Sequence, residues 1–190
     1  MKRGCPAQRF SAPYIRIFSF FLRPGSRPAD HRDEVLRRMR ALAEVAEQAD
    51  VQLLHENEKE IYGDTPERCL DVVTSVGSPH LRLAWDPENF VQVGVQPFTE
   101  GYTQLRPHLA YIQIKDARAA DGEVVVAGAG DGQVVTTIRA LRDDGFDGFF
   151  SLEPHLGRTD STGAFSGPEL FTSAWQAFTD ILRAEQISFA

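Results

Sequence analysis

The sequence predicts an α/β fold in which short parallel strands alternate with helices. Runs rich in β-branched and aromatic residues alternate with segments whose apolar residues recur at helical spacing. Each strand and its following helix take roughly 30–40 residues, which is typical of a (β/α) barrel or an open doubly wound sheet. No linker divides the 190 residues, and two cysteines give no disulfide framework. We therefore expect one domain built on a parallel sheet.

The expected elements follow one another with recognisable boundaries. Strands are expected at residues 14–20, 51–54, 81–85, 110–114 and 149–152, and helices at 33–49, 66–76, 134–142 and 170–183, with a shorter helix within 99–106. Thr65 is the expected N-cap of the second helix, with Pro66 in its first turn and Gly77 at its end. Ser166 and Glu169 have the spacing of a capping box before the last helix.

Composition and charge exclude several classes of function. The 20 basic and 27 acidic residues give a net charge of −7, which argues against a nucleic-acid partner. The apolar run at 14–22 contains Arg16 and is too short to span a membrane. Without a signal-peptide pattern, we expect a cytoplasmic protein with no membrane partner. The glycines at 128–132 lack the spacing of a dinucleotide fingerprint and are expected to form a turn, within a loop and short hairpin at 117–132.

Polar side chains that can bind a metal ion stand at the ends of four expected strands. They are Glu56, Asp86, Gln113 and Glu153. Because the carboxyl ends of parallel strands converge, the three carboxylates are expected to share one pocket. Carboxylates in a desolvated pocket repel one another unless a cation neutralises them, and oxygen ligands suit Mn²⁺, Mg²⁺ or Co²⁺. The alternative is that each acid only caps the following helix or faces solvent.

Three further residues near these strand ends are candidate substrate-binding groups. Lys115 could contact a substrate hydroxyl or phosphate, or instead form a salt bridge with Asp116 or Glu153. His155 could bind substrate or orient the neighbouring carboxylate. Asn89 could donate a hydrogen bond in the pocket, or only cap a turn.

Five motifs occur in one order along the chain. They are Tyr14-Ile-Arg-Ile-Phe-Ser-Phe, then Leu54-His-Glu-Asn-Glu58 with Ile61-Tyr-Gly-Asp-Thr65, then Trp85-Asp-Pro-Glu-Asn-Phe90, Ile112-Gln-Ile-Lys-Asp-Ala117 and Ser151-Leu-Glu-Pro-His155. In this order and spacing the sequence resembles the sugar phosphate isomerase/epimerase family. These are xylose isomerase-like TIM barrels, which share a superfamily with the apurinic endonucleases. The resemblance implies an α/β fold that is a partial (β/α)8 TIM barrel at residues 12–190. Its five parallel strands, with flanking helices, are equivalent to the fourth to eighth of the barrel. Residues 1–11 are then a lead-in, expected to be disordered.

The resemblance also implies a metal centre and a mechanism. One divalent metal (Mn²⁺, Mg²⁺ or Co²⁺, with Zn²⁺ as an alternative) would be held by Glu56, Asp86, Gln113 and Glu153. Glu56 and Glu153 would also be the acid/base pair that moves a proton through an enediolate. The family has histidine where this chain has Gln113, and an amide oxygen binds a cation more weakly than imidazole does.

The function expected from this resemblance belongs to carbohydrate metabolism. It is isomerisation or epimerisation of a small sugar, a sugar phosphate or a keto acid. A nuclease or dehydratase of the same superfamily is a second enzymatic hypothesis, of which the endonuclease branch is disfavoured because few histidines flank the strand ends and the charge is acidic. The remaining alternative is a truncated, catalytically impaired remnant or a non-catalytic sugar- or metal-binding protein. Five strands cannot close a barrel, so a homodimer could cover the open sheet edges.

Overall fold

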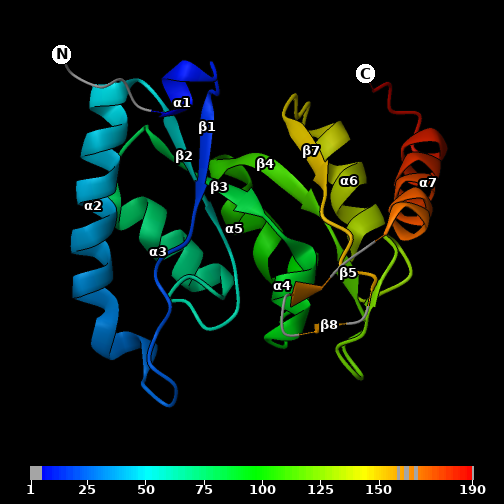
Figure 1. Ribbon diagram of the computed structural model, residues 1–190, viewed down its shortest axis with the longest axis horizontal. Coiled ribbons are helices and arrows are strands. Elements are labelled where there is room, and N and C mark those ends of the chain that lie inside the picture. The colour runs from blue at the N-terminus through cyan, green and yellow to red at the C-terminus, as the bar shows by residue number, and fades with distance from the viewer. Residues whose placement is uncertain (1–5, 158, 161–162, 165–166, 190) are drawn as a thin grey trace. The chain divides into compact units, whose positions relative to one another are not determined.

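The computed structural model describes residues 6–157, 159–160, 163–164 and 167–189. They form two compact units: Met1–Trp85 with Gln104–Tyr111, and Asp86–Thr103 with Ile112–Ala190. Five parallel strands occur in the order β1-β2-β3-β4-β7, as Figure 1 labels them, which confirms the α/β fold with flanking helices. Among the described residues, no helix combines the length and the apolar character needed to cross a bilayer.

The first unit contains the first three parallel strands. Its elements are α1 (Pro6–Arg9), β1 (Tyr14–Ile17), the 3₁₀ helix η1 (Pro28–His31), α2 (Arg32–Ala49), β2 (Gln52–Glu56), α3 (Pro66–Val76), β3 (Leu81–Trp85) and the 3₁₀ helix η3 (Arg106–His108). The helix α1 lies within the expected lead-in. Strand β1 ends at Ile17, short of the predicted residue 20, and Phe20 adopts a left-handed backbone with φ of 71°, which is incompatible with an extended strand.

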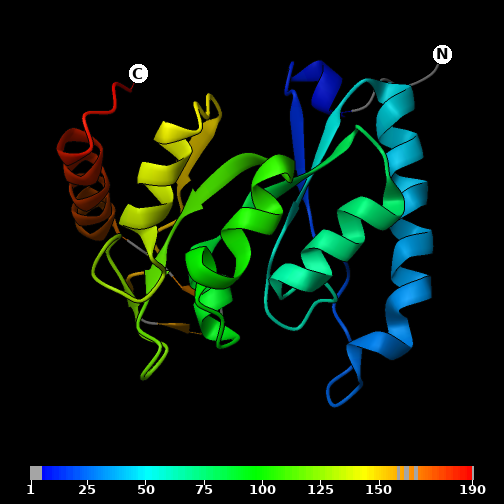
Figure 2. The same ribbon diagram turned by 180° about the vertical axis from the view of Figure 1, so that it is seen from behind.

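Helices α2 and α3 pack against each other beside the strands of the first unit (Figure 2). The predicted apolar face of α2 is buried and includes Leu36, Met39, Ala43 and Ala46. Helix α3 begins after Thr65, with Pro66 in its first turn, and ends at Gly77 in the left-handed conformation, as predicted. The Thr65 side chain makes no capping hydrogen bond.

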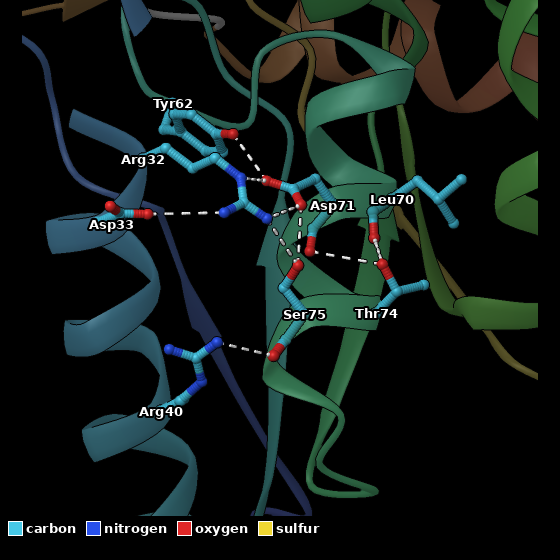
Figure 3. A network of polar contacts seen from close by, with 8 residues as sticks. All are labelled: Arg32, Asp33, Arg40, Tyr62, Leu70, Asp71, Thr74 and Ser75. Atoms are coloured by element: carbon cyan, nitrogen blue, oxygen red, sulfur yellow. Dashed lines mark hydrogen bonds and ion pairs between the residues drawn. The ribbon is translucent and has the colours of Figure 1, made fainter. Parts of the chain in front are cut away.

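A polar network joins α2 to α3 (Figure 3). Arg32 donates two hydrogen bonds to the carboxylate of Asp71, at 2.8 and 2.6 Å, and a third to Ser75 Oγ. The Tyr62 hydroxyl donates to the same carboxylate at 2.7 Å. Because the Arg32 guanidinium and these donors favour the charged carboxylate, they lower the pKa of Asp71 to about 2. The network fixes the beginning of α2 against the middle of α3.

The second unit carries the remaining predicted strand ends. Its elements are α4 (Pro87–Gln92), the π-helix η2 (Pro97–Tyr102), β5 (Asp116–Ala117), β6 (Val124–Val125), α6 (Val134–Asp143), β7 (Phe149–Leu152), β8 (Thr159–Asp160), β9 (Gly163–Ala164) and α7 (Pro168–Ala184), while α5 (Thr103–Leu105) and β4 (Leu109–Ile114) contribute to both units. The helix α4 was not predicted. The pairing of β5 with β6 confirms the expected hairpin. Helix α7 begins after Gly167, and Ser166 of the predicted capping box lies outside the described residues.

The glycine-rich loop that follows β6 binds the carboxylate of Asp116 through its backbone. The amides of Gly128, Gly130 and Gly132 donate to this carboxylate at 2.8 to 3.1 Å, and the amide of Ala117 donates at 2.9 Å. Burial raises the pKa of Asp116, and these amides act in the opposite direction because they favour the ionised form. The predicted turn thus binds a carboxylate of the same chain through its backbone amides.

The first testable prediction concerns the network between α2 and α3. Replacing Asp71 by Asn removes the charge that Arg32 binds, and we expect the free energy of unfolding at pH 7 to fall by about 1 kcal/mol, since the pair is partly exposed. The folded-state pKa of Asp71, about 2, lies below the ordinary 3.8, so its contribution is complete above pH 4 and declines as the pH falls toward 2. Urea unfolding between pH 6 and pH 3 measures how the free energy of unfolding of each protein depends on pH. The exposed Asp147→Asn, outside this network, serves as control, and an equal loss at every pH would contradict the assignment.

The second prediction concerns the loop around Asp116. A β-carbon at Gly130 would overlap Asp116 Oδ1 and lie 2.5 Å from the carbonyl oxygen of Ala117. Gly130→Ala is therefore expected to lower the free energy of unfolding by about 2 kcal/mol, the usual cost of overpacking. The matched control is Gly167→Ala, because no atom lies within 4 Å of a β-carbon there. Equal urea midpoints for the two variants would show that the loop does not hold Asp116 closely.

Candidate active site

Asp86 stands directly after β3, with its side chain fully buried. It is the N-cap of α4: its Oδ1 atom accepts a hydrogen bond of 3.0 Å from the backbone amide of Asn89, and Pro87 occupies the first helical position. The capping role that the sequence left as an alternative is therefore real. It uses one carboxylate oxygen, and the other, Oδ2, faces Lys115 at 3.0 Å.

Lys115 is the centre of a buried charge cluster. Its ammonium nitrogen lies 3.0 Å from Asp86 Oδ2, 3.1 Å from Glu88 Oε2 and 3.4 Å from Glu153 Oε2. The side chain of Lys115 is 3% exposed, and those of Asp86 and Glu88 are at most 3% exposed, whereas that of Glu153 is 31% exposed. Desolvation lowers the pKa of Lys115, but the three carboxylates outweigh it, and the pKa is raised well above its usual range. Lys115 is thus held as a cation.

Glu88 is the member of this cluster that sequence reasoning missed. It lies in the first turn of α4, two residues after Asp86, and is buried. Its Oε1 atom accepts a hydrogen bond from the Gln92 side chain, one helical turn later, while Oε2 contacts Lys115. An Asp followed by Pro and Glu is a recognisable helix start, and this signal would have placed Glu88 beside Asp86.

Glu153 and His155 lie beyond the end of β7, at the edge of the cluster. One carboxylate oxygen of Glu153 faces Lys115, and the other lies 3.5 Å from His155 Nε2. Both side chains are about one third exposed. The structure thus brings together Asp86, Lys115, Glu153 and His155, and it confirms the expected contact between Lys115 and Glu153. The other expected partner, Asp116, is instead occupied by backbone amides.

The remaining predicted residues lie at the ends of their own strands. Gln113 is the second-last residue of β4, is buried, and accepts a hydrogen bond from the Ser151 hydroxyl of β7 at Oε1. Glu56, in the first unit, ends β2 and is 1% exposed. Its Oε2 accepts a hydrogen bond of 2.9 Å from Arg16 of β1, and its register partner on β3 is Ala84.

Within the second unit, the donors fit a divalent cation. Asp86 and Glu153 offer carboxylate oxygens within 4.8 Å of each other. Two oxygens at this separation need only a small side-chain adjustment to bind one ion at 2.0–2.2 Å, the usual range for carboxylate ligands. Hard oxygen donors of this kind favour Mg²⁺ and Mn²⁺ over soft metals. The pair can therefore serve as part of a metal site.

Comparison with known proteins finds a family that matches most of the chain and a relative that matches one part of it. The model of the xylose isomerase-like TIM barrel family matches residues 6–173. A 2-epi-5-epi-valiolone 7-phosphate 2-epimerase from Actinoplanes sp. is 41% identical over 78 residues, which are 40% of this chain and 28% of the epimerase.

Solved structures share the fold at low identity. A D-tagatose 3-epimerase-like protein superimposes with a TM-score of 0.77 at 15% identity, over 95% of this chain and 66% of its own. A xylose isomerase-like TIM barrel protein from Mycobacterium smegmatis, in complex with magnesium, gives a TM-score of 0.66 at 18% identity, over 94% of this chain and 64% of its own. The chain thus spans just under two thirds of the length of these structures. With most of its residues matched by the family model, it belongs to the xylose isomerase-like TIM barrel family.

Proposed function

We propose that this chain acts as a divalent-metal-dependent isomerase or epimerase of a small sugar, a sugar phosphate or a keto acid. The observation that carries the proposal is the convergence of Asp86 and Glu153 at the ends of two strands, in a chain of this family. The 41% identity over 78 residues to a 2-epi-5-epi-valiolone 7-phosphate 2-epimerase supports an epimerase that acts on a small phosphorylated substrate.

The proposed metal ligands are Glu56, Asp86, Gln113 and Glu153. Glu56 is included because its register partner, Ala84, lies two residues before Asp86 on the neighbouring strand. The metal would polarise the carbonyl and hydroxyl oxygens of the substrate and stabilise negative charge on them. Mn²⁺, Mg²⁺ and Co²⁺ match the oxygen donors best, with Zn²⁺ as the alternative.

The proposed proton transfer uses the two glutamates. One carboxylate removes the proton from the carbon next to the substrate carbonyl, and the electron pair of that C–H bond moves to form an enediolate. The other carboxylate, once protonated, returns a proton to carbon, and the enediolate becomes the product. Glu153 suits this role because its side chain is partly exposed and accessible to substrate, while His155 lies 3.5 Å from it and can orient it. Asn89, Lys115 and His155 are the proposed substrate-binding residues.

One observation favours a second candidate, a non-catalytic sugar- or metal-binding protein. Gln113 stands where the family resemblance implies a histidine, and its Oε1 atom already accepts a hydrogen bond from Ser151. A neutral amide oxygen is a weaker ligand than imidazole, so a protein that binds metal weakly and lacks turnover would be consistent with this residue. The two experiments that follow separate these candidates.

The third prediction tests the acid/base role of Glu153. Glu153→Gln is expected to abolish epimerisation, because an amide can neither accept a proton from the substrate nor return one to it. NMR measures the epimer formed and the deuterium incorporated next to the carbonyl. The assay uses a panel of ketohexoses and their phosphates in D₂O with Mn²⁺. Glu169→Gln, on the exposed beginning of α7, should retain the wild-type rate. Epimerisation that survives in Glu153→Gln would exclude this role, and a wild-type chain without exchange or epimerisation would favour the binding protein.

The fourth prediction tests residue 113 as a ligand. Gln113→His is expected to tighten Co²⁺ binding by about tenfold, since imidazole is the stronger donor. Isothermal titration calorimetry gives the dissociation constant, and the Co²⁺ absorption spectrum reports the added nitrogen ligand. Gln176→His, on an exposed position of α7, controls for a surface histidine that binds metal by itself. An unchanged dissociation constant in Gln113→His would mean that residue 113 does not bind the metal.

A further inference from the structure

Lys115 contacts one oxygen of Asp86 and one oxygen of Glu153, the two carboxylates of this unit that the proposed metal would bind. Oδ1 of Asp86 is engaged with the amide of Asn89, so Oδ2 is the oxygen left to a cation, and Lys115 lies 3.0 Å from it. On Glu153, the oxygen near Lys115 is Oε2. An ammonium group at 3.0–3.4 Å from two oxygens and a divalent ion at about 2.1 Å from the same two would repel each other strongly in a buried site.

Glu88 differs from the other two carboxylates in what it contacts. It lies in the first turn of α4, at 2% exposure, with Oε1 accepting a hydrogen bond from Gln92 and Oε2 at 3.1 Å from Lys115. It is not among the strand-end donors that cluster as candidate metal ligands. Its carboxylate therefore offers Lys115 a position that a metal bound to Asp86 and Glu153 does not occupy.

The charges of the cluster support two cations rather than one. Three carboxylates and one ammonium give a net charge of 1 − 3 = −2. A divalent ion added to this set makes it neutral only if Lys115 stays. Expelling Lys115 would leave three carboxylates, two of them buried, against a charge of +2, and an uncompensated buried charge is costly.

We propose that Lys115 is an exchangeable counter-cation of the site, which compensates Asp86 and Glu153 in the metal-free protein and moves onto Glu88 when a divalent ion binds them. This inference rests on the proposed metal site and adds to it two residues that are not ligands. Lys115 keeps the metal-free site intact and lowers its metal affinity. Glu88 limits that competition by holding Lys115 in place.

The fifth prediction tests the exchange in the full chain, with Co²⁺ alone as the probe. Lys115→Met is expected to lower the melting temperature of the metal-free protein by several degrees, because its carboxylates lose their counter-cation. The same variant should bind Co²⁺ about tenfold more tightly and gain more thermal stability from Co²⁺ than the wild type does. Lys59→Met, at an exposed lysine, should behave as the wild type in both measurements.

A double-mutant cycle distinguishes the displacement of Lys115 by the metal ion from a simple electrostatic attraction between Glu88 and the metal ion. Glu88→Gln is expected to weaken Co²⁺ binding about tenfold in the wild-type background, because Lys115 then competes fully for Asp86 and Glu153. In the Lys115→Met background, the same change should alter the dissociation constant less than about twofold. An equal loss in both backgrounds would show that Glu88 only attracts the metal by its charge, and the exchange would be excluded.

The other possible results also test the proposed role of Lys115. If Lys115→Met does not fold without metal, Lys115→Gln retains a hydrogen-bond donor without the charge and replaces it in the cycle. Unchanged or weaker Co²⁺ binding in the lysine variants would overturn the exchange while leaving the metal site in place. If no variant and no wild-type protein binds Co²⁺ at millimolar concentration, the proposed metal-dependent function fails, and the exchange fails with it.

Discussion

The compensation of buried negative charge is the constraint on which the second unit depends. Asp86 and Glu88 are almost completely inaccessible, and Glu153 is only one third exposed. Burying carboxylates without a counter-charge costs several kcal/mol for each ion, so this arrangement requires a cation nearby. Lys115 supplies it at 3.0 to 3.4 Å from all three, and the strong rise of its pKa shows how far the carboxylates favour its charged form.

The buried negative charge of the next residue, Asp116, is compensated in a different way. Asp116 is as buried as Asp86, yet backbone amides of a glycine-rich loop compensate its charge instead of a lysine. Because these amides occupy Asp116, Lys115 has no competing contact there and remains with the strand-end carboxylates. The loop also fixes the backbone directly after Lys115. Consecutive residues of opposite charge are thereby directed to different partners.

The sequence was sufficient to predict the strands and most of the strand-end residues. Asp86 and Glu153 could be found because the end of a parallel strand has a fixed position relative to its neighbours, so a residue's place along the strand decides where its side chain lies. Position along a strand does not indicate Glu88, because it lies in the short helix α4. Six residues are too few to show a helical period, and the signal for this helix is its Asp-Pro-Glu start. The partner of Lys115 was left open between Asp116 and Glu153 because that choice depends on a loop more than ten residues further along the chain.

Gln113 stands where the family resemblance implies a histidine, and it gives the proposed site a different ligand of the same charge. Neutral imidazole and an amide both add no charge, so the balance between Lys115, the three carboxylates and a divalent ion is the same with either residue. What differs is the strength of one donor, and that donor already accepts a hydrogen bond from Ser151. In the proposed site, the carboxylates must therefore supply most of the attraction for a metal.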